Sequence, residues 1–269
     1  MKEKQGQDKY NIIAFPKARQ PVVDSLRQAR RMNVIHIITE IDVTNARRWI
    51  REFREKTGES LSFTAFLTSC LARAVDEDKH MHAYRTGHKL IVYDEVDISV
   101  LIEREVAGGK APIFPHVVKG ANRKTLREIH DEIRAAQREE VGSSGKGRLI
   151  GLYWLLPAFI RGLIWRRLLG SPHWRKKVTG TVAISAVGMF GKGSGWGIPI
   201  PTYTLSITVG GIAERPSMVE GQIEISECLS MTISFDHDII DGAPAARFTQ
   251  RLKELTESGY GLRDEGQMA

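Results

Sequence analysis

Near the C-terminus, a histidine and an aspartate lie four residues apart in the stretch SFDHDIIDGAPAARF, residues 234–248. His237 follows an apolar, β-branched segment, so we expect it at the end of a strand, where the neighbouring backbone fixes its ring. One ring nitrogen can then donate to a carbonyl group while the other acts as a base near neutral pH. Asp241 would orient the turn or hold a cation, and Gly242 would allow a bend that a side chain would block. The same spacing also fits an ordinary turn with a satisfied polar histidine, and alone it favours neither interpretation.

Helical and strand-like segments alternate along the chain on both sides of this stretch. Such interleaving predicts a single α/β domain with a mixed sheet. Thr44 is expected to cap one helix, which Gly58 ends, and Ser62 or Thr64 begins the next. The expected helices cover residues 19–31, 45–58, 63–75, 122–140 and 243–258, and the expected strands or extended segments lie within 34–43, 84–102, 110–118, 178–191, 203–214, 222–229 and 230–237.

Each of the four longer helices carries an apolar stripe that is expected to face the core. The stripes consist of Trp49, Ile50 and Phe53; of Phe66, Leu67, Cys70, Leu71, Ala74 and Val75; of Leu126, Ile129, Ile133 and Ala136; and of Ala246, Phe248, Leu252 and Leu255.

The overall composition is that of a globular protein, with 42% hydrophobic and 26% charged residues. Cys70 and Cys228 lie far apart within apolar segments, which indicates buried thiols in a reducing cytoplasm rather than a disulfide. No zinc-ligand spacing is present, so we expect no metal site. The polar N-terminus lacks the apolar region of a signal peptide, and we therefore expect a cytoplasmic location.

The net charge of +7 comes from one segment of the chain. Residues 141–179 contain eight Lys and Arg and no Asp or Glu, whereas the rest of the chain holds 31 basic and 32 acidic residues. Because the excess is confined to this segment, its distribution argues against nucleic acid as a partner.

The stretch around His237 resembles the end of the catalytic domain of dihydrolipoyl acyltransferases, the core components of 2-oxo acid dehydrogenase complexes, and more distantly chloramphenicol acetyltransferase. The family pattern there is SFDHRxxDGAxAARF. A second block, GTVAISAVGMFG at residues 180–191, is similar to the family's GTFTISNLGMFG. The resemblance extends over about residues 19–255, with weaker matches in family order at 40–44, 62–75, 96–100 and 111–118.

This resemblance implies an α/β, chloramphenicol acetyltransferase-like two-layer sandwich with a mixed β-sheet, assembled as a homotrimer with active sites between subunits. It implies that His237 is the general base that takes a proton from a thiol of coenzyme A or of a dihydrolipoyl group, so that an acyl group moves between thioesters. Ser185 corresponds to the hydroxyl that binds the tetrahedral oxyanion from the neighbouring subunit, and Asp241 to the aspartate that holds the active-site turn through a salt bridge. Gly242, Gly188 and Gly191 would support the turn and the loop.

Elementary acid–base chemistry is consistent with these roles. A thiol has a reference pKa of about 8.5 and a histidine one of about 6.5, so a positioned imidazole can take up a thiol proton without a metal. A serine in a strand before a glycine-rich loop is, by itself, more often structural than catalytic. Without the resemblance, Ser185 would therefore be taken as structural.

Two residues depart from the family pattern. Asp238 replaces an arginine beside the proposed base, and Ala186 replaces an asparagine near the proposed oxyanion site. A carboxylate beside His237 would favour the cationic ring, to an extent that depends on the direction in which Asp238 points. We expect an active enzyme tuned to another acyl group. The alternatives are a scaffold protein that kept the fold and lost catalysis, and an acyltransferase that uses a hydroxyl or amine acceptor.

The matched region leaves short ends and one extra segment. Residues 1–18 are expected to form a polar tail, too short for a lipoyl domain, residues 19–258 the catalytic domain, and residues 259–269 a C-terminal tail. No covalently bound cofactor is expected, and no lipoyl-lysine DKA motif is present. The acyl group would then arrive on coenzyme A or on a separate lipoylated carrier protein, and trimers could build a larger cage.

The extra segment, residues 147–177, is apolar and basic where relatives have a short polar loop, and it holds three of the five tryptophans. Pro157 interrupts its apolar run, which falls short of the roughly 20 residues needed to span a bilayer. Three interpretations stay open. Two short helices could pack on the trimer or a larger assembly with basic side chains in solvent, could line a tunnel for a longer acyl chain with charges that meet coenzyme A phosphates, or could contact an anionic membrane surface.

Overall fold

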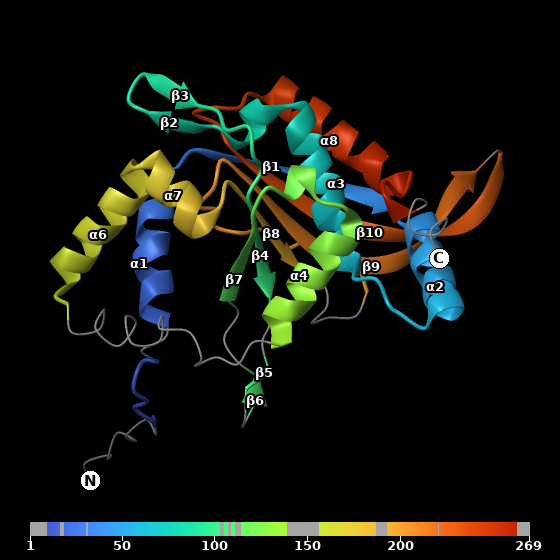
Figure 1. Ribbon diagram of the computed structural model, residues 1–269, viewed down its shortest axis with the longest axis horizontal. Helices are drawn as coiled ribbons and strands as arrows, with labels where there is room; N and C mark the ends of the chain where they lie inside the picture. The colour runs from blue at the N-terminus through green and yellow to red at the C-terminus, as the bar shows by residue number, and fades with distance from the viewer. Residues whose placement is uncertain are drawn as a thin grey trace, which may run out of the picture.

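A six-stranded mixed sheet forms the centre of the molecule in the computed structural model (Figure 1). The structure describes residues 10–16, 19–30, 32–102, 105–106, 109–110, 114–138, 156–186, 193–219 and 221–262. The strand order is β1, β10, β9, β8, β4, β7, and β8 runs parallel to both of its neighbours while the other adjacent pairs are antiparallel. The strands are β1 (Val34–Asp42), β4 (Ile98–Ile102), β7 (Phe114–Val118), β8 (Val182–Ala186), β9 (Leu205–Val219) and β10 (Gln222–Asp236).

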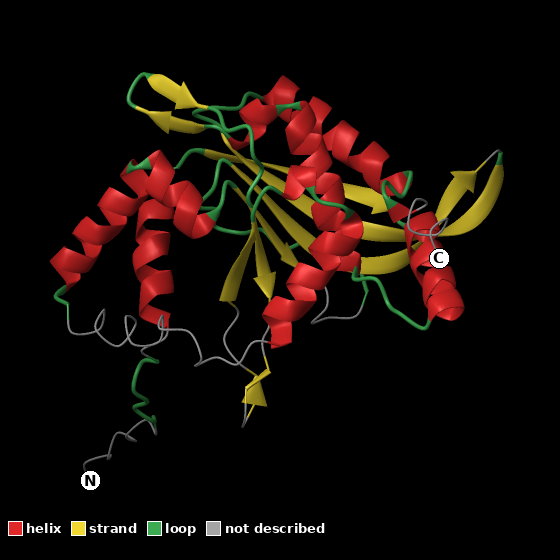
Figure 2. Cartoon of the chain, in the orientation of Figure 1, coloured by secondary structure: helices red, strands yellow, loops and turns green. Residues whose placement is uncertain are grey.

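Four helices form the second layer on one face of this sheet (Figure 2). The predicted mixed-sheet sandwich is confirmed. Helix α3 contacts α4, α8 and β4, and it is buried on most sides because it lies between them. The four apolar residues predicted for the buried stripe of α4 are all buried. These helices are α2 (Thr44–Thr57), α3 (Phe63–Glu77), α4 (Leu126–Arg138) and α8 (Gly242–Glu257).

The predicted C-terminus of one helix and N-terminus of the next are confirmed, whereas the predicted cap at Thr44 is wrong. Gly58 ends α2 in the left-handed conformation, and the Ser62 hydroxyl accepts a hydrogen bond from Ala65 N–H at the start of α3. Thr44 is the first residue of α2 and does not cap it. Its hydroxyl instead accepts a hydrogen bond from Glu227 N–H at 2.8 Å, which ties the start of α2 to β10.

Two predictions near the C-terminus need correction. The expected strands 222–229 and 230–237 form one strand, β10, which has an irregularity between Leu229 and Met231 and ends one residue before His237. Ala246 is exposed, and Ala245 takes its place in the core because it shares the helix face of Phe248, Leu252 and Leu255.

Both cysteines are free thiols. Cys70 is buried as predicted, and its burial raises its pKa. Cys228 is only partly buried, contrary to the prediction, since it alternates along β10 with Leu229, which points into the core.

Helices α1 (Gln20–Ala29), α6 (Ala158–Gly170) and α7 (Pro172–Thr179) lie together beside the main sandwich (Figure 1). Helices α6 and α7 contact each other, and α6 packs on α1. The remaining elements lie elsewhere around the sheet. They are the hairpin of β2 (Tyr84–Thr86) with β3 (Lys89–Ile91), the pair β5 (Glu105–Val106) with β6 (Gly109–Lys110), and two 3-10 turns at Lys79–His82 and Ala121–Arg123, both of which contact α3.

The loop after β8 returns across β9 at two consecutive glycines. A Cβ atom on Gly210 would overlap the carbonyl oxygen of Gly195, and one on Gly211 would overlap that of Gly193. The loop is also held by Trp196, whose indole N–H donates to Thr39 O at 3.2 Å. The pair of glycines inside β9 therefore serves a close backbone crossing rather than a turn.

Candidate active site

His237 lies in the turn directly after β10, and its backbone and ring are both fixed by hydrogen bonds. Its N–H donates to Asn33 O at 2.6 Å, just before β1 begins. Its Nδ1 lies 3.1 Å from Ile240 O and must donate to it, because a carbonyl oxygen only accepts. In the neutral ring Nε2 is then unprotonated, and among the described residues it has no hydrogen-bond partner. The side chain is 44% exposed, so this nitrogen is free to act as a base toward a ligand.

Asp238, the residue that departs from the family pattern, points away from the imidazole. Its Oδ1 accepts from the Asn33 side-chain amide at 2.9 Å, and its Oδ2 lies 3.5 Å from the guanidinium of Arg85 in β2. The carboxylate thus fastens the turn to the start of β1 and to the β2–β3 hairpin. Asp236, on the other side of His237, is more deeply placed, and burial raises its pKa, with the negative charge of Asp238 acting in the same direction.

Asp241 and Gly242 behave differently from each other. The Asp241 carboxylate is 86% exposed and lies 3.7 Å from His237 Nδ1, and that ring is its only ion-pair partner in the described part of the chain. The expected bend at Gly242 is wrong. Gly242 is the first residue of α8, its φ is not positive, and a Cβ placed on it would meet no atom within 4 Å.

We therefore expect a Gly242→Ala substitution to leave the folded chain at least as stable as the wild type. Alanine avoids the backbone entropy that glycine loses in a helix, which corresponds to a gain of up to about 1 kcal/mol. Thermal unfolding of the two proteins checks this, and a lower midpoint for Gly242→Ala would restore the original view that the turn requires glycine.

Ser185 lies in β8 on the face of the sheet opposite the helices, since its neighbour Ile184 points into the core. It is aligned with Thr208 in β9, which is aligned with Thr232 in β10, five residues before His237. With about 3.3 Å per residue and about 4.8 Å between strands, Ser185 and His237 of one chain are roughly 19 Å apart. One chain therefore does not bring them together. Ala186 ends β8, and Gly188 and Gly191 lie outside the described residues.

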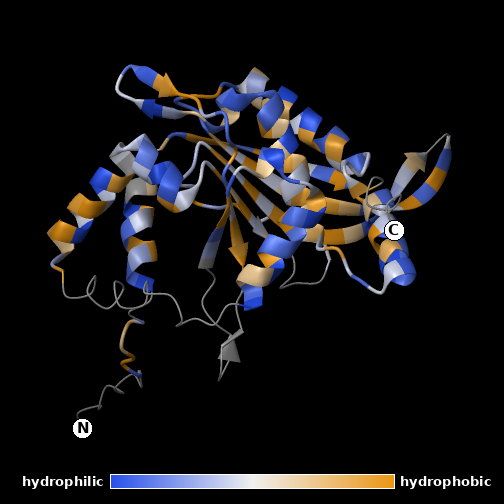
Figure 3. Ribbon diagram, viewed as in Figure 1, coloured by the Kyte–Doolittle hydropathy of each residue, from blue (hydrophilic) through white to orange (hydrophobic). Residues whose placement is uncertain are grey.

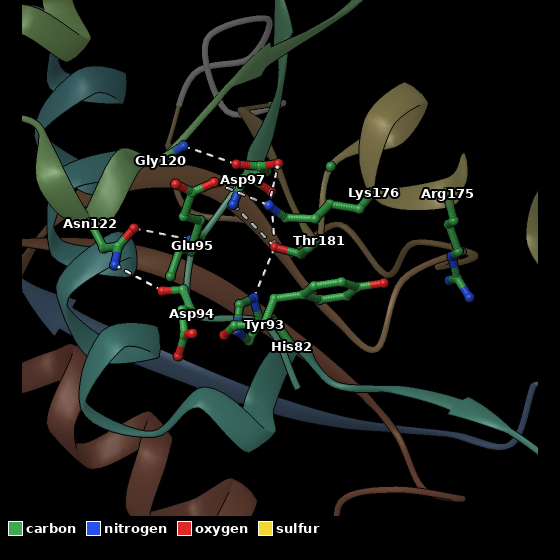
Figure 4. Close-up of polar contacts among 12 residues, drawn as sticks. His82, Tyr93, Asp94, Glu95, Asp97, Gly120, Asn122, Arg175, Lys176 and Thr181 are labelled. Carbon is green, nitrogen blue, oxygen red and sulfur yellow. Dashed lines mark hydrogen bonds and ion pairs between the residues drawn. The ribbon is translucent and has the colours of Figure 1, made fainter. Parts of the chain in front are cut away.

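A second histidine, which the sequence patterns did not single out, forms a buried polar cluster (Figure 4). His82 is fully buried, with Nε2 3.0 Å from Tyr93 O and Nδ1 2.9 Å from the Thr181 hydroxyl. The neutral ring satisfies both contacts, since Nε2–H donates to the carbonyl and Nδ1 accepts from the hydroxyl. Burial lowers the pKa of His82 to about 4, and the charge of nearby Lys176 adds to this effect. With both nitrogens engaged, His82 holds structure rather than a substrate.

This cluster makes a pH-dependent contribution to stability. Because the pKa of His82 is depressed in the folded chain, the unfolded chain binds the proton more readily, and the stabilisation is complete above about pH 6.5 and lost as the pH falls through about 4. The loss is on the order of 3 kcal/mol. The free energy of unfolding, measured with denaturant at pH 7 and near pH 4, should therefore differ less between the two pH values in a His82→Asn variant than in the wild type. The exposed His80 provides the control, and His80→Asn should keep the wild-type dependence.

The same cluster anchors the extra segment to the core. Lys176 of α7 lies 3.3 Å from Asp97 Oδ2 and 3.4 Å from Glu95 Oε2, as Figure 4 shows. Arg175 lies over the ring of Tyr84 at 4.0 Å, a cation–π geometry, and also donates to Thr202 O.

Helix α6 is anchored through α1. The Arg161 guanidinium lies 3.0 Å from the carboxylate of the buried Asp24. Of the three interpretations of residues 147–177, the one with basic side chains in solvent does not hold for Arg161, Arg175 and Lys176, since carboxylates, a carbonyl and an aromatic ring receive them.

None of the helices in the described part of the chain is long and apolar enough to cross a bilayer. Among the same residues, no three or more His, Cys, Asp and Glu side chains are grouped so that they could hold a metal ion.

Comparison with known proteins identifies the fold and the family. The family model described as 2-oxoacid dehydrogenases acyltransferase (catalytic domain) matches residues 7–143 and 175–261. The lipoamide acyltransferase component of the branched-chain alpha-keto acid dehydrogenase complex of Bacillus subtilis is 26% identical over 224 residues, which cover 81% of this chain and 45% of that protein. The dihydrolipoyllysine-residue acetyltransferase component of the pyruvate dehydrogenase complex of Zymomonas mobilis is 25% identical over 260 residues, 94% of this chain and 51% of that protein. The chain thus spans about half the length of these relatives.

Solved structures show the same fold. A probable dihydrolipoamide acetyltransferase from Listeria monocytogenes superposes with a TM-score of 0.69 at 21% identity, covering 93% of this chain and 95% of the other. The cubic core of a pyruvate dehydrogenase multienzyme complex superposes with a TM-score of 0.70 at 16% identity, covering 94% of both chains. The family model matches most of the chain, and the solved structures share its fold. The chain therefore belongs to the family of 2-oxoacid dehydrogenase acyltransferase catalytic domains.

Proposed function

We propose that the chain catalyses transfer of an acyl group between coenzyme A and a dihydrolipoyl thiol, with His237 as the general base. The observation that carries this proposal is the state of the imidazole. Nδ1–H is held by Ile240 O, so Nε2 is the basic nitrogen, and the ring is nearly half exposed. A histidine that only closed a turn would not need to present its basic nitrogen to solvent.

The spacing of the residues supports the same assignment. A dihydrolipoamide acetyltransferase of Azotobacter vinelandii, a structural neighbour at 17% identity, was studied for the catalytic roles of a serine, a histidine 52 residues later and an asparagine four residues after that. In this chain Ser185 precedes His237 by 52 residues, and Asp241 follows it by four. On this basis we assign Ser185 the role of stabilising the oxyanion and Asp241 the role of supporting the His237 ring.

The roughly 19 Å between Ser185 and His237 within one chain favours a site made by two copies. Ser185 lies on the sheet face opposite the helix layer and is itself only partly buried, so that another copy could approach it there. Its hydroxyl would then donate to the substrate oxyanion beside the imidazole of the adjacent copy. We accordingly propose a homotrimer as the active unit, and the resemblance to a cubic core supports further assembly of trimers into a cage.

The proposed reaction needs one base and one oxyanion donor. Nε2 of His237 takes the proton from the acceptor thiol, and the resulting sulfur attacks the carbonyl carbon of the acyl thioester. The carbonyl oxygen becomes an oxyanion that the Ser185 hydroxyl stabilises. The tetrahedral intermediate then expels the original sulfur, which takes the proton back from Nε2–H. The histidine ends in its starting state, and the reverse transfer uses the same steps.

The dihydrolipoyl group would come from a lipoylated carrier protein, as the names of the relatives suggest. A thiol-release assay tests the proposal. Dihydrolipoamide is supplied as acceptor with a panel of acetyl, succinyl, branched-chain and longer acyl-coenzyme A donors, and released coenzyme A is measured. We expect turnover with at least one donor. Absence of turnover with every donor, in a folded and assembled protein, would favour the scaffold alternative, and turnover only with a hydroxyl or amine acceptor would assign a different acyl acceptor.

A further inference from the structure

Helices α6 and α7 carry a surface that the rest of the fold leaves exposed. In α6, Phe159 and Leu163 are 76% and 62% exposed, and Arg166 continues their stripe one turn further on. Ile164, 44% exposed, and Arg167 form the adjacent stripe. We call these residues, together with Trp174, Lys177 and Val178 of α7, the α6–α7 face.

Helix α7 divides its residues between two sides. Trp174, Lys177 and Val178 follow one another at helical spacing and are exposed, with Trp174 64% and Val178 50% accessible. Arg175 and Lys176, on the other side, are held by the core contacts described above. A tryptophan, a lysine and a valine in solvent on one side of a short helix have no role in the fold of this chain.

The basic residues of the segment also divide into two sets. Arg161, Arg175 and Lys176 satisfy their charges inside the molecule. Arg166, Arg167 and Lys177 are exposed and form no ion pair within the described residues. Because residues 141–179 contain no Asp or Glu, no carboxylate of the segment offsets them. The exposed charge of this face is therefore entirely positive.

Apolar and hydrophilic residues alternate along α6, which lies at the edge of the molecule (Figure 3). The family match is interrupted from residue 144 to 174, so α6 lies outside it. The α6 part of the face and Trp174 are thus outside the region shared with the family, whereas Lys177 and Val178 lie within it.

We propose that the α6–α7 face docks the protein on an anionic lipid bilayer. Exposed large apolar side chains together with arginine and lysine match the composition of the boundary between lipid headgroups and acyl chains, where tryptophan is also favoured. The positive charges, which have no carboxylate partner in the described part of the chain, complement anionic headgroups, and a neutral partner would not supply counter-charges. Since neither helix can span a bilayer, the helices lie on the surface. This inference does not depend on the catalytic assignment.

Vesicle flotation of the full chain tests the proposal. The protein is mixed with phosphatidylcholine vesicles that either contain or lack phosphatidylglycerol, at low and high salt. We expect flotation with the anionic vesicles only, weakened by salt. Arg166→Glu with Arg167→Glu should lower the partition coefficient about tenfold or more, since each basic residue near an anionic surface contributes separately. Phe159→Ser with Leu163→Ser should also reduce the partition coefficient. This reduction should be seen even at low salt, where the attraction between the basic residues and the headgroups is still strong.

The matched control changes charge by the same amount elsewhere. Arg54 and Lys56 are exposed on α2, and Arg54→Glu with Lys56→Glu should float as the wild type does. All variants should keep the wild-type unfolding midpoint and acyl transfer in solution, because the substituted side chains are exposed and none contacts Ser185, His237 or Asp241 within the described residues. If the variant with Arg166→Glu and Arg167→Glu does not fold, the more conservative variant with Arg166→Gln and Arg167→Gln is used in its place.

Three results would overturn the proposal. They are no flotation of the wild-type chain with anionic vesicles, equal flotation with vesicles that lack phosphatidylglycerol, and a change in the mass of the assembly caused by the α6 substitutions without any lipid binding. The last result would identify the face as a contact between copies of the chain.

Discussion

The His237→Ala variant is expected to transfer acyl groups about 10²- to 10⁴-fold more slowly than the wild type, the usual contribution of a positioned general base. The substitution removes Nε2 and with it the only group in the described turn that could accept a thiol proton at neutral pH. The imidazole also donates to Ile240 O, but this is a single hydrogen bond from a half-exposed ring, and its loss should cost only about 1 kcal/mol. We therefore expect kcat to fall with little change in the unfolding midpoint.

A pH profile separates loss of the base from a merely structural effect. Without the imidazole, only acceptor molecules that are already thiolates react, so the residual rate of His237→Ala should rise with pH up to the thiol pKa of about 8.5. The exposed His88 of the β2–β3 hairpin gives a matched control, and His88→Ala should keep the wild-type rate. Equal rates for His237→Ala and wild type would remove His237 from the mechanism.

Local patterns in the sequence were sufficient to predict the helix and sheet layers of the fold. The stripe of Leu126, Ile129, Ile133 and Ala136 has helical spacing, and burial of one face requires nothing from distant parts of the chain. The cap at Ser62 and the stop at Gly58 are similarly local. Ala246 was misplaced because a shift of one residue turns a helix by about 100°; Ala245, three residues before Phe248, shares the buried face, and Ala246 does not.

Contacts between segments that are distant in the sequence could not be predicted from local patterns. His82, Asp97 and the pair Lys176 and Thr181 come from three separate stretches, and no local pattern around one stretch predicts the other two. The direction of Asp238 is a similar case, since Asn33 and Arg85 decide it. In this chain Asp238 forms an ion pair at the turn, with Arg85 supplying the positive charge from the hairpin.

The pairing of Asp238 also bears on the choice between enzyme and scaffold. A carboxylate of Asp238 placed against Nε2 would hold a proton on that nitrogen and block it from acting as a base. Because Asp238 is instead directed to Asn33 and Arg85, the departure from the family pattern leaves Nε2 of His237 unobstructed. Residues that hold the turn are thus separate from the residue that would perform the chemistry.

Ser185→Ala should lower kcat about 10²- to 10³-fold, the cost of losing one oxyanion donor. Ser185 is only partly buried and alanine occurs beside it in β8, so the strand should tolerate the change. A serine with a structural role would instead lower the unfolding midpoint and leave the rate of the folded fraction unchanged. Ser99, a buried serine in the adjacent strand β4, provides the comparison, since Ser99→Ala should leave the rate of the folded protein unaltered.

Co-expression of the Ser185→Ala and His237→Ala chains tests whether two copies share a site. In a trimer whose sites each take the histidine of one chain and the serine of the next, every mixed trimer has one intact site. With equal expression and random assembly, about three quarters of the trimers are mixed, and about a quarter of the wild-type activity should return. Chains purified separately and not allowed to exchange give the control and should stay inactive. If both residues acted within one chain, no mixture could contain an intact site, and co-expression would recover nothing. Because the sheet register separates Ser185 and His237 by roughly 19 Å in one chain, we expect recovery.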